Sequence, residues 1–173
     1  MKNKVLVDTY NLYHWHKNWN RIQKSFFVES YELYEKSKIE NFVKENNFKN
    51  TYVIKDNFID FNFNQTTNLE KADLILITDQ KFSRSKCVDI IKNIEKMLDG
   101  CNNLFVCLNR HYLNITGVEN DKELPDDYEE SIEIWLKNSL SSYKIKNYSE
   151  KFIDDGSYFT WVIPDQKFHI CKQ

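Results

Sequence analysis

The sequence predicts an α/β fold, a three-layer sandwich with a mostly parallel sheet and a C-terminal antiparallel hairpin. Three observations lead to this prediction. Segments of β composition alternate along the chain with segments of helical periodicity, as in proteins built from βαβ units. The run ADLILITD at residues 72–79 is apolar on both faces, as expected for a central strand of a parallel sheet. Two alternating segments near the C-terminus flank a Pro-Asp-Gln sequence typical of a turn.

The length of the chain and its charge limit the possible classes of protein. We expect the 173 residues to form a single α/β domain, 1–173, large enough to bury a core. The net charge of -2 excludes the sequence-wide basic excess of tight, non-specific nucleic-acid binders. No apolar run approaches the roughly 18 residues of a membrane span, and the N-terminus lacks the pattern of a signal peptide. We therefore expect a cytoplasmic protein.

Cysteines and glycines exclude further classes. The four cysteines form no CxxC pair, so we expect free thiols rather than a disulfide framework or a zinc ribbon. The chain has only three glycines, and neither GxGxxG nor GxxxxGK[ST] is present. Because such glycine-rich loops let the backbone approach phosphate groups, a P-loop NTPase and a standard dinucleotide-binding enzyme are both excluded.

The first part of the chain predicts three extended segments and one helix. KVLVD, at residues 4–8, has the composition of a buried strand. Apolar residues recur at helical spacing between 25 and 45, which predicts a long amphipathic helix. TYVIKD, at 51–56, returns to β composition, and FIDFNFNQ, at 58–65, alternates apolar and polar residues. The second of these segments suits a half-buried strand or an extended edge, and the two are candidates for a hairpin.

The second part of the chain continues the alternation. After the strand at 72–79, residues 83–100 predict a helix that a serine can cap and Gly100 can close. A strand follows at 102–109 and another amphipathic helix at 124–143, with Pro125 in its first turn. The chain then passes through KIKNYSEKF to the C-terminal hairpin, whose two arms flank a turn at 164–166.

Polar side chains end four of the predicted strands. VLVD ends in Asp8, YVIKD in Asp56, LILITD in Asp79 and LFVCLN in Asn109. Because sites in open α/β sheets form at the carboxyl ends of parallel strands, we expect three carboxylates and an amide to converge on one edge. Such oxygen ligands suit Mg²⁺ or Mn²⁺, ions that activate water and stabilise charge on a phosphodiester. Asp and Asn at these positions are also common helix caps and turn residues, so both interpretations remain open.

Two of these segments resemble the motifs of a known enzyme family. KVLVDTYNLY resembles the opening of PIN and NYN ribonuclease domains, where the first strand ends in an Asp and an Asn follows after a short polar step. ADLILITDQKF resembles their later strand, which ends in Thr or Ser and an Asp. The resemblance implies metal-dependent cleavage of RNA, with Asp8 and Asp79 as ligands of Mg²⁺ or Mn²⁺ and Asn11 as a supporting polar residue.

The candidate site residues divide by role. The predicted catalytic residues are the three strand-end carboxylates, of which Asp56 completes the cluster begun by the two metal ligands, Asp8 and Asp79. The predicted substrate-binding residues carry amide or guanidinium groups that orient water or bind phosphate, namely Asn11, Asn109 and Arg110.

A second resemblance covers part of the same sequence. LEKADLILITDQKFSRSKCVDII resembles the central strand and following helix of TIR and related nucleoside-glycosidase-like domains, including a serine and a cysteine before the helix. This resemblance implies nucleotide binding or glycosidase activity. The family carries a catalytic Glu on that helix, for which Asp89 is the nearest candidate.

The histidines are candidates for a different site. His14 and His16 are one residue apart and, together with His111 or His169, have the chemistry to bind zinc or to transfer protons. Aromatic residues flank the first pair, and no cysteine or acidic partner stands at a standard spacing. An aromatic cluster at a helix start or on the surface is therefore the favoured interpretation.

A protein without catalytic activity is the alternative class. An acidic-leaning chain with 15% aromatic residues and few glycines suits an immunity protein, an antitoxin, or a phage or mobile-element inhibitor of a host nucleic-acid enzyme. Residues 114–130 and the C-terminal hairpin, with Tyr158 and Trp161, are its expected contact elements. The expected partner is thus RNA or a host protein, and the distance between the Asp8 and Asp79 carboxylates distinguishes the two classes.

Overall fold

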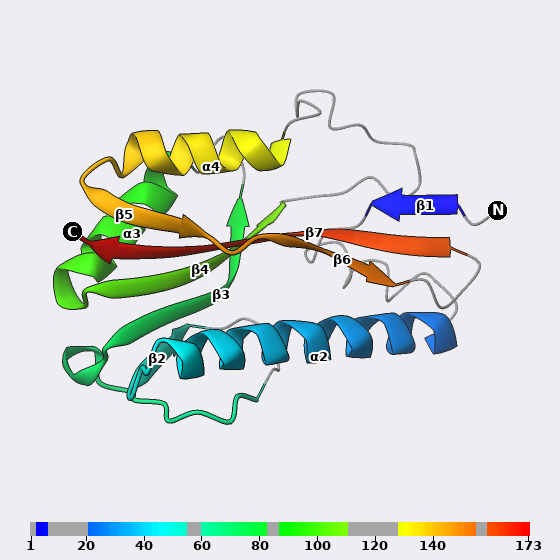
Figure 1. Cartoon of the computed structure of the whole chain (residues 1–173), viewed down its shortest axis with the longest axis horizontal. Helices are drawn as coiled ribbons and strands as arrows, with labels where there is room; N and C mark the ends of the chain where they lie inside the picture. Colours follow the sequence, from blue (N-terminus) through cyan, green and yellow to red (C-terminus); the bar gives the residue numbers. More distant parts are fainter. Residues whose placement is uncertain (1–2, 7–20, 55–59, 83–86, 111–127, 155–158) are drawn as a thin grey trace.

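Helices and β-strands alternate along the chain in a computed structural model of the protein (Figure 1), which confirms the α/β class. The structure describes residues 3–6, 21–54, 60–82, 87–110, 128–154 and 159–173. The helices are α2 (Arg21–Glu45), α3 (Cys87–Gly100), α4 (Tyr128–Ser139) and a 3₁₀ turn, η1 (Leu69–Lys71). The strands are β1 (Asn3–Leu6), β2 (Thr51–Ile54), β3 (Leu74–Phe82), β4 (Asn103–Arg110), β5 (Tyr143–Asn147), β6 (Glu150–Asp154) and β7 (Phe159–Lys172).

Apolar stripes account for the helices. In α3 the residues Ile90, Ile94 and Leu98 follow one another at intervals of four and are buried. The same spacing buries the equivalent residues of α4 and of the turn after it, Ile132, Leu136 and Leu140. None of the helices among the described residues is long and apolar enough to cross a bilayer.

A left-handed residue ends α2. Asn47, two positions after the helix, has a φ of 57°. The Phe48 N–H donates to the Val43 carbonyl at 3.1 Å, and the Asn47 N–H donates to the Lys44 carbonyl, also at 3.1 Å. These two hydrogen bonds form a Schellman motif, in which Asn tolerates the left-handed backbone better than most residues other than glycine. The motif turns the chain from α2 into β2.

The sheet is mixed, and the prediction of a mostly parallel sheet is wrong. Its strand order is β1-β7-β4-β3-β2, with β5 and β6 also paired to β7. The pairs β1–β7, β2–β3 and β3–β4 are parallel, whereas β4, β5 and β6 each run antiparallel to β7. The long C-terminal strand is therefore the element that converts a parallel βαβ arrangement into a mixed sheet.

The predicted C-terminal hairpin is not formed by the segment to which it was assigned. The Pro-Asp-Gln sequence at 164–166 lies inside β7, a single strand of 14 residues. β6 pairs with Pro164 through Lys151, while on the other side of β7 the partners stop at Val162 and resume at Gln166. A proline is tolerated here because no strand on that second side needs its missing N–H.

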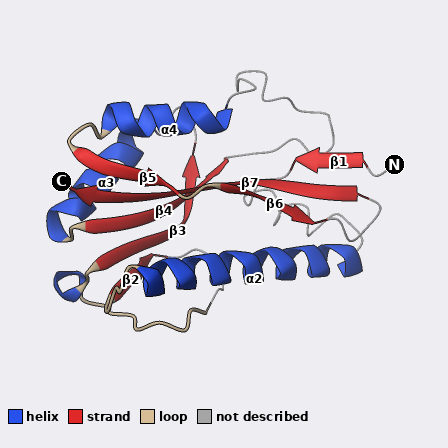
Figure 2. Cartoon of the chain, in the orientation of Figure 1, coloured by secondary structure: helices blue, strands red, loops and turns tan. Residues whose placement is uncertain are grey.

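Two strands share each side of β7. Asn147 pairs with Phe168 and Glu150 with Asp165, so β5 and β6 continue one register along the same side. At Val162, β7 pairs with both β6 and β1, which places β1 on the opposite side, together with β4. In Figure 2, β1 and β4 accordingly point toward each other along β7.

Apolar side chains form two buried clusters on the sheet. The first joins residues of α3 and α4 to alternate residues of β3, β4 and β7, among them Ile75, Val106 and Phe168. The second joins α2 to the intervening residues of β3 and β4, with the Phe42 and Phe105 rings 4.2 Å apart. Alternation along a strand sends successive side chains to opposite faces, so both faces of the central strands are buried.

The segment predicted to extend β2 into a hairpin takes another arrangement. Among residues 60–65, only Gln65 pairs with β2, through a single parallel bridge to Thr51. The Phe61 and Phe63 rings stack 5.0 Å apart, and Phe61 is buried against the cluster beneath α2. The prediction of an antiparallel hairpin is therefore wrong for the described part of this segment.

Candidate functional site

The predicted strand-end residues are only partly within the described structure. Asp8, Asn11 and Asp56 lie outside the described residues. Asn109 and Arg110 are the last two residues of β4, as predicted, and Asp79 lies within β3. β3 continues for three residues beyond Asp79 to Phe82, so the prediction that this strand ends at Asp79 is wrong.

A β-bulge surrounds Asp79. Ile77 pairs with Val106 and Gln80 pairs with Leu108, so two residues of β3, Thr78 and Asp79, face a single residue of β4. The buried Thr78 hydroxyl donates to the Ile54 carbonyl of β2 at 3.4 Å. Bulges bend a strand and are frequent beside active sites, where they change the direction of a side chain. The local backbone at Asp79 is thus irregular at the position where the sequence predicts a ligand.

The carboxyl ends of β1 and β4 approach each other along β7. Leu6, the last residue of β1, pairs with Val162, and Leu108 of β4 pairs with Gln166. Val162 and Gln166 are four positions apart on β7, which corresponds to about 13 Å along an extended strand. β1 runs antiparallel to β3 and β4, so its carboxyl end reaches this region from the opposite direction to that expected for a parallel sheet.

Gln166 contributes a buried oxygen to this region. Its side chain is 5% exposed, and its Oε1 atom has no hydrogen-bond partner in the described structure. Burying an amide without a hydrogen bond is costly, typically by about 1–3 kcal/mol. An oxygen of this kind beside the ends of β1 and β4 is suited to bind a ligand.

The metal and histidine predictions have few described residues to test them. No group of three or more His, Cys, Asp or Glu side chains within the described part of the chain is arranged to hold a metal ion. His14, His16 and His111 lie outside the described residues. His169 is half-buried and forms a 3.0 Å hydrogen bond with Asn103, and burial followed by the charges of Lys146 and Lys144 lowers its pKa.

The contact residues predicted for the alternative functions are also only partly described. Asp89, the acidic candidate from the TIR resemblance, is exposed in the first turn of α3. Trp161 lies in β7, where its backbone pairs with Val5 on one side and Asp154 on the other. Tyr158 and most of 114–130 lie outside the described residues.

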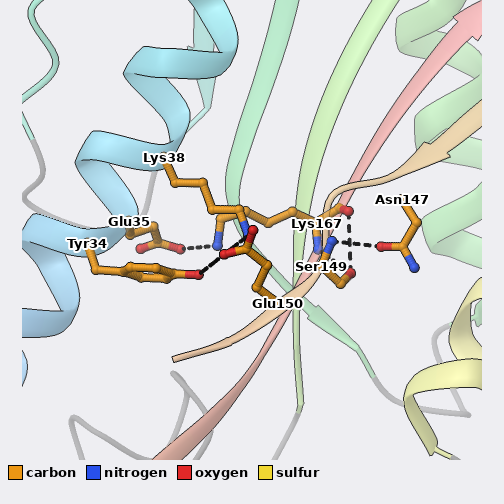
Figure 3. Close-up of polar contacts among 7 residues, drawn as sticks. All are labelled: Tyr34, Glu35, Lys38, Asn147, Ser149, Glu150 and Lys167. Atoms are coloured by element: carbon orange, nitrogen blue, oxygen red, sulfur yellow. Dashed lines mark hydrogen bonds and ion pairs between the residues drawn. The ribbon is translucent and has the colours of Figure 1, made fainter. Parts of the chain in front are cut away.

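A buried ion pair joins α2 to the sheet. Lys167 of β7 is completely buried and Glu35 of α2 is 3% exposed, with 3.4 Å between Lys167 Nζ and Glu35 Oε1 (Figure 3). A buried ammonium or carboxylate is strongly unfavourable alone, and each group here provides the countercharge of the other. The pair therefore fixes the position of α2 on β7.

The backbone opposite Lys167 is adapted to this position. Between β5 and β6, the Tyr148 N–H donates to the Lys167 carbonyl at 2.8 Å, and the Lys167 N–H donates to the Ser149 hydroxyl at 3.0 Å. The Ser149 N–H in turn donates to the Asn147 side chain at 2.7 Å (Figure 3). Side-chain hydrogen bonds thus replace one step of the strand ladder and hold Lys167 in register.

A second polar group lies beside the buried pair. Tyr34 and Lys38 project from α2 toward Glu150 of β6 (Figure 3). The Tyr34 hydroxyl donates to Glu150 Oε2 at 3.2 Å, Lys38 Nζ lies 3.4 Å from the same oxygen, and Lys38 also donates to the Tyr34 hydroxyl at 3.4 Å. Burial and the Glu150 and Glu35 charges raise the pKa of Tyr34 well above its usual value. We refer to Tyr34, Glu35, Lys38, Glu150 and Lys167 as the α2 polar cluster.

Sequence analysis did not identify the α2 polar cluster, although two signals were available. Glu35 stands four residues before Ile39 and four after Tyr31, within the apolar stripe of the helix. Lys167 stands on the α2-facing side of β7, two residues before the half-buried His169. A charged residue on a buried helical stripe and another within a buried strand predict a partner for each, because such charges are rarely buried unpaired.

Comparisons of the chain with known protein families, with curated proteins and with solved structures find no match.

Proposed function

We propose that the chain is a metal-dependent ribonuclease of PIN/NYN type, acting on RNA phosphodiester bonds in the region between the ends of β1, β3 and β4. In this proposal the fold is a three-layer sandwich, with α2 on one face of the sheet and α3 and α4 on the other. The observation that carries the proposal is the buried, unpaired Gln166 oxygen at the point where β1 and β4 approach each other.

The donor set of this region fits a hard divalent cation. Asp8 and Asp79 are the proposed ligands and Asp56 the third carboxylate, so the cation receives oxygen atoms, which Mg²⁺ and Mn²⁺ prefer. The β3 bulge at Asp79 supports this assignment, because bulges often redirect side chains beside active sites. When bound, such an ion activates water and stabilises negative charge on the phosphodiester.

Polar residues around the carboxylates have complementary roles in the proposal. Arg110, the last residue of β4, supplies a guanidinium that binds a phosphate oxygen in bidentate fashion. Asn109 and Asn11 orient the attacking water or the ribose through their amide groups. Gln166 accepts a hydrogen bond from the substrate or from a metal-bound water, which satisfies its otherwise unpaired oxygen.

The proposal is tested by incubating fluorescently labelled single-stranded RNA with the protein and Mn²⁺, Mg²⁺ or EDTA. Wild type is expected to cleave RNA with either metal but not with EDTA. Asp8→Asn and Asp79→Asn are expected to lower the rate by at least about 100-fold, since each removes a proposed ligand charge. Asp99→Asn, an exposed substitution at the end of α3, is the matched control and is expected to retain the wild-type rate.

Gln166→Leu separates a ligand role from a structural one. Leucine removes an unpaired buried oxygen, so the folded state is expected to be as stable as wild type or more stable. The cleavage rate is nevertheless expected to fall about ten-fold, the effect of losing one hydrogen bond of about 1.4 kcal/mol. If wild type leaves RNA intact with both metals, the ribonuclease assignment is wrong, and recovery of a host protein in pull-down then favours the inhibitor class.

A further inference from the structure

Lys38 occupies the partly exposed end of the α2 polar cluster. Its side chain is 15% exposed, whereas that of Glu150, which lies beside it, is 65% exposed. Figure 3 shows the Lys38 amine between the Tyr34 hydroxyl and the Glu150 carboxylate, above the buried Lys167–Glu35 pair. The amine is thus close to the surface but surrounded by protein on its inner side.

Charged groups reach Lys38 from each neighbouring element. Tyr34 and Glu35 come from its own helix, Glu150 from β6, Lys167 from β7 and Cys107 from β4, where Cys107 pairs with Lys167. Burial, followed by the Lys167 charge, lowers the pKa of Lys38 to about 8, although Glu150 and Cys107 act in the opposite direction. Desolvation beside a second cation is one of the ways in which enzymes activate a lysine amine as a nucleophile.

We propose that Lys38, held between the Tyr34 hydroxyl and the Glu150 carboxylate beside the buried Lys167 ammonium, is a nucleophilic amine that activated acyl donors modify selectively. The donor class is a small acyl group bound to a good leaving group, as in acetyl phosphate or acetyl-coenzyme A. This modification site is separate from the proposed ribonuclease site and does not depend on it.

The reaction is a simple acyl transfer. The neutral Lys38 amine attacks the acyl carbon and forms a C–N bond, while the bond to the leaving phosphate or thiolate breaks. The amine proton passes to the Glu150 carboxylate or to water, and no oxidation or reduction takes place. The product is a neutral amide, which can no longer form the ion pair with Glu150 that links α2 to β6.

Competitive acetylation tests the proposal. The native protein at pH 7.5 is treated with a limiting amount of acetyl phosphate or, separately, of acetyl-coenzyme A, and acetylation at each lysine is measured by mass spectrometry with isotope-labelled standards. Lys36, two residues away on the same helix and 30% exposed, is the internal control. The same reactions in 8 M urea provide the unfolded reference.

We expect native Lys38 to be acetylated about ten times faster than Lys36. A pKa near 8 makes the neutral fraction at pH 7.5 roughly 200-fold larger than for an ordinary lysine, and lower basicity and partial burial reduce this advantage. The ratio is expected to fall to about one in urea, because both amines are then equally solvated. The donor that acetylates Lys38 identifies the source of the acyl group.

A double variant tests the cause. Glu35→Leu with Lys167→Met removes the neighbouring cation without leaving an unpaired buried charge, so the acetylation ratio of Lys38 to Lys36 is expected to fall several-fold. An unchanged ratio in the folded double variant would show that the cluster does not activate Lys38. The proposal is overturned if neither donor acetylates native wild-type Lys38 faster than Lys36.

Discussion

Removing one member of the buried Lys167–Glu35 pair is expected to cost much more stability than removing the pair. Lys167→Met leaves the Glu35 carboxylate, 3% exposed, without its countercharge. Breaking a buried ion pair in this way typically costs about 3–5 kcal/mol. At about 2–4 °C per kcal/mol for a chain of this size, the melting temperature is expected to fall by roughly 6–20 °C. Glu35→Gln is expected to destabilise the protein in the same direction, because it leaves a buried ammonium.

The double variant Glu35→Leu with Lys167→Met has the opposite expectation. Both charges are then replaced by apolar side chains of similar size, and such replacements are often neutral or stabilising by about 1–4 kcal/mol. The free energies of unfolding are measured by urea denaturation at pH 7.5, with far-ultraviolet circular dichroism as the signal. The slope of each transition shows whether the variants unfold with the same change in exposed surface.

An exposed ion pair provides the control. Lys137 and Glu133 form a 2.6 Å pair at positions i and i+4 of α4, with side chains 53% and 26% exposed. Lys137→Met is expected to cost less than about 1 kcal/mol, because solvent screens exposed pairs. If Lys167→Met costs no more than Lys137→Met, or if the effects of Glu35→Leu and Lys167→Met simply add in the double variant, the two buried charges do not depend on each other.

Two further predictions concern pH and a loop anchor. The lowered pKa of Lys38 means that the folded protein binds fewer protons than the unfolded chain between about pH 8 and pH 10.5, so stability rises with pH across this window. Wild type is expected to gain about 1 kcal/mol relative to Lys38→Met between pH 7.5 and 9.5 in urea denaturation. Above about pH 10 this gain is offset, since the raised pKa of Tyr34 stabilises the folded state only while both forms keep the phenol proton. Equal pH slopes for the two proteins would contradict the assignment to Lys38. Separately, Asp73→Ala is expected to cost about 1–2 kcal/mol in the same assay, because the carboxylate accepts the Lys49 and Asn50 N–H groups at 2.6 and 3.0 Å. Asp73→Asn, which keeps one acceptor oxygen, should lose less, and a loss equal to that of Asp73→Ala would be evidence against these hydrogen bonds.

Local periodicity predicted the helices well because each presents one apolar stripe to the sheet. Ile94 and Leu98 of α3, and Ile132, Leu136 and Leu140 at α4, are buried as their spacing predicts. Ile90, rather than Ile91, completes the buried row of α3, since the row follows intervals of four from Leu98. A stripe of this kind is a property of neighbouring residues, so it can be recognised without knowledge of the sheet.

Strand pairing depends on distant residues and was predicted less well. The Pro-Asp-Gln sequence is typical of a turn, but pairing with β6 on one side and with β1 and β4 on the other extends β7 through it. The parallel pairing of Asn3–Leu6 with residues 159–162 has no local signal in either segment. For this reason the direction of β1, and with it the arrangement of the strand ends, did not follow from the order of elements.

The candidate site residues show the same division between local and distant information. That Asn109 and Arg110 end a strand follows from local composition, whereas the bulge at Asp79 arises from the pairing of β3 with β4. The Lys167–Glu35 pair joins residues 132 positions apart. Sequence patterns could mark each charge as unusual for its position, but they could not identify the two as partners.

β7 connects the α2 polar cluster to the region proposed for RNA cleavage. Lys167 pairs with Cys107 and is adjacent to Gln166, whose buried oxygen lies at the β4 end of the gap between β1 and β4. The ion pair with Glu35 therefore holds α2 against β7 one residue from this gap. Functional groups act best when packing and hydrogen bonds fix their supporting elements, and the pair supplies such a constraint for Gln166. A lysine that is costly to bury is thus explained by its position, because it makes the backbone of β7 rigid where the strand lacks a partner on one side.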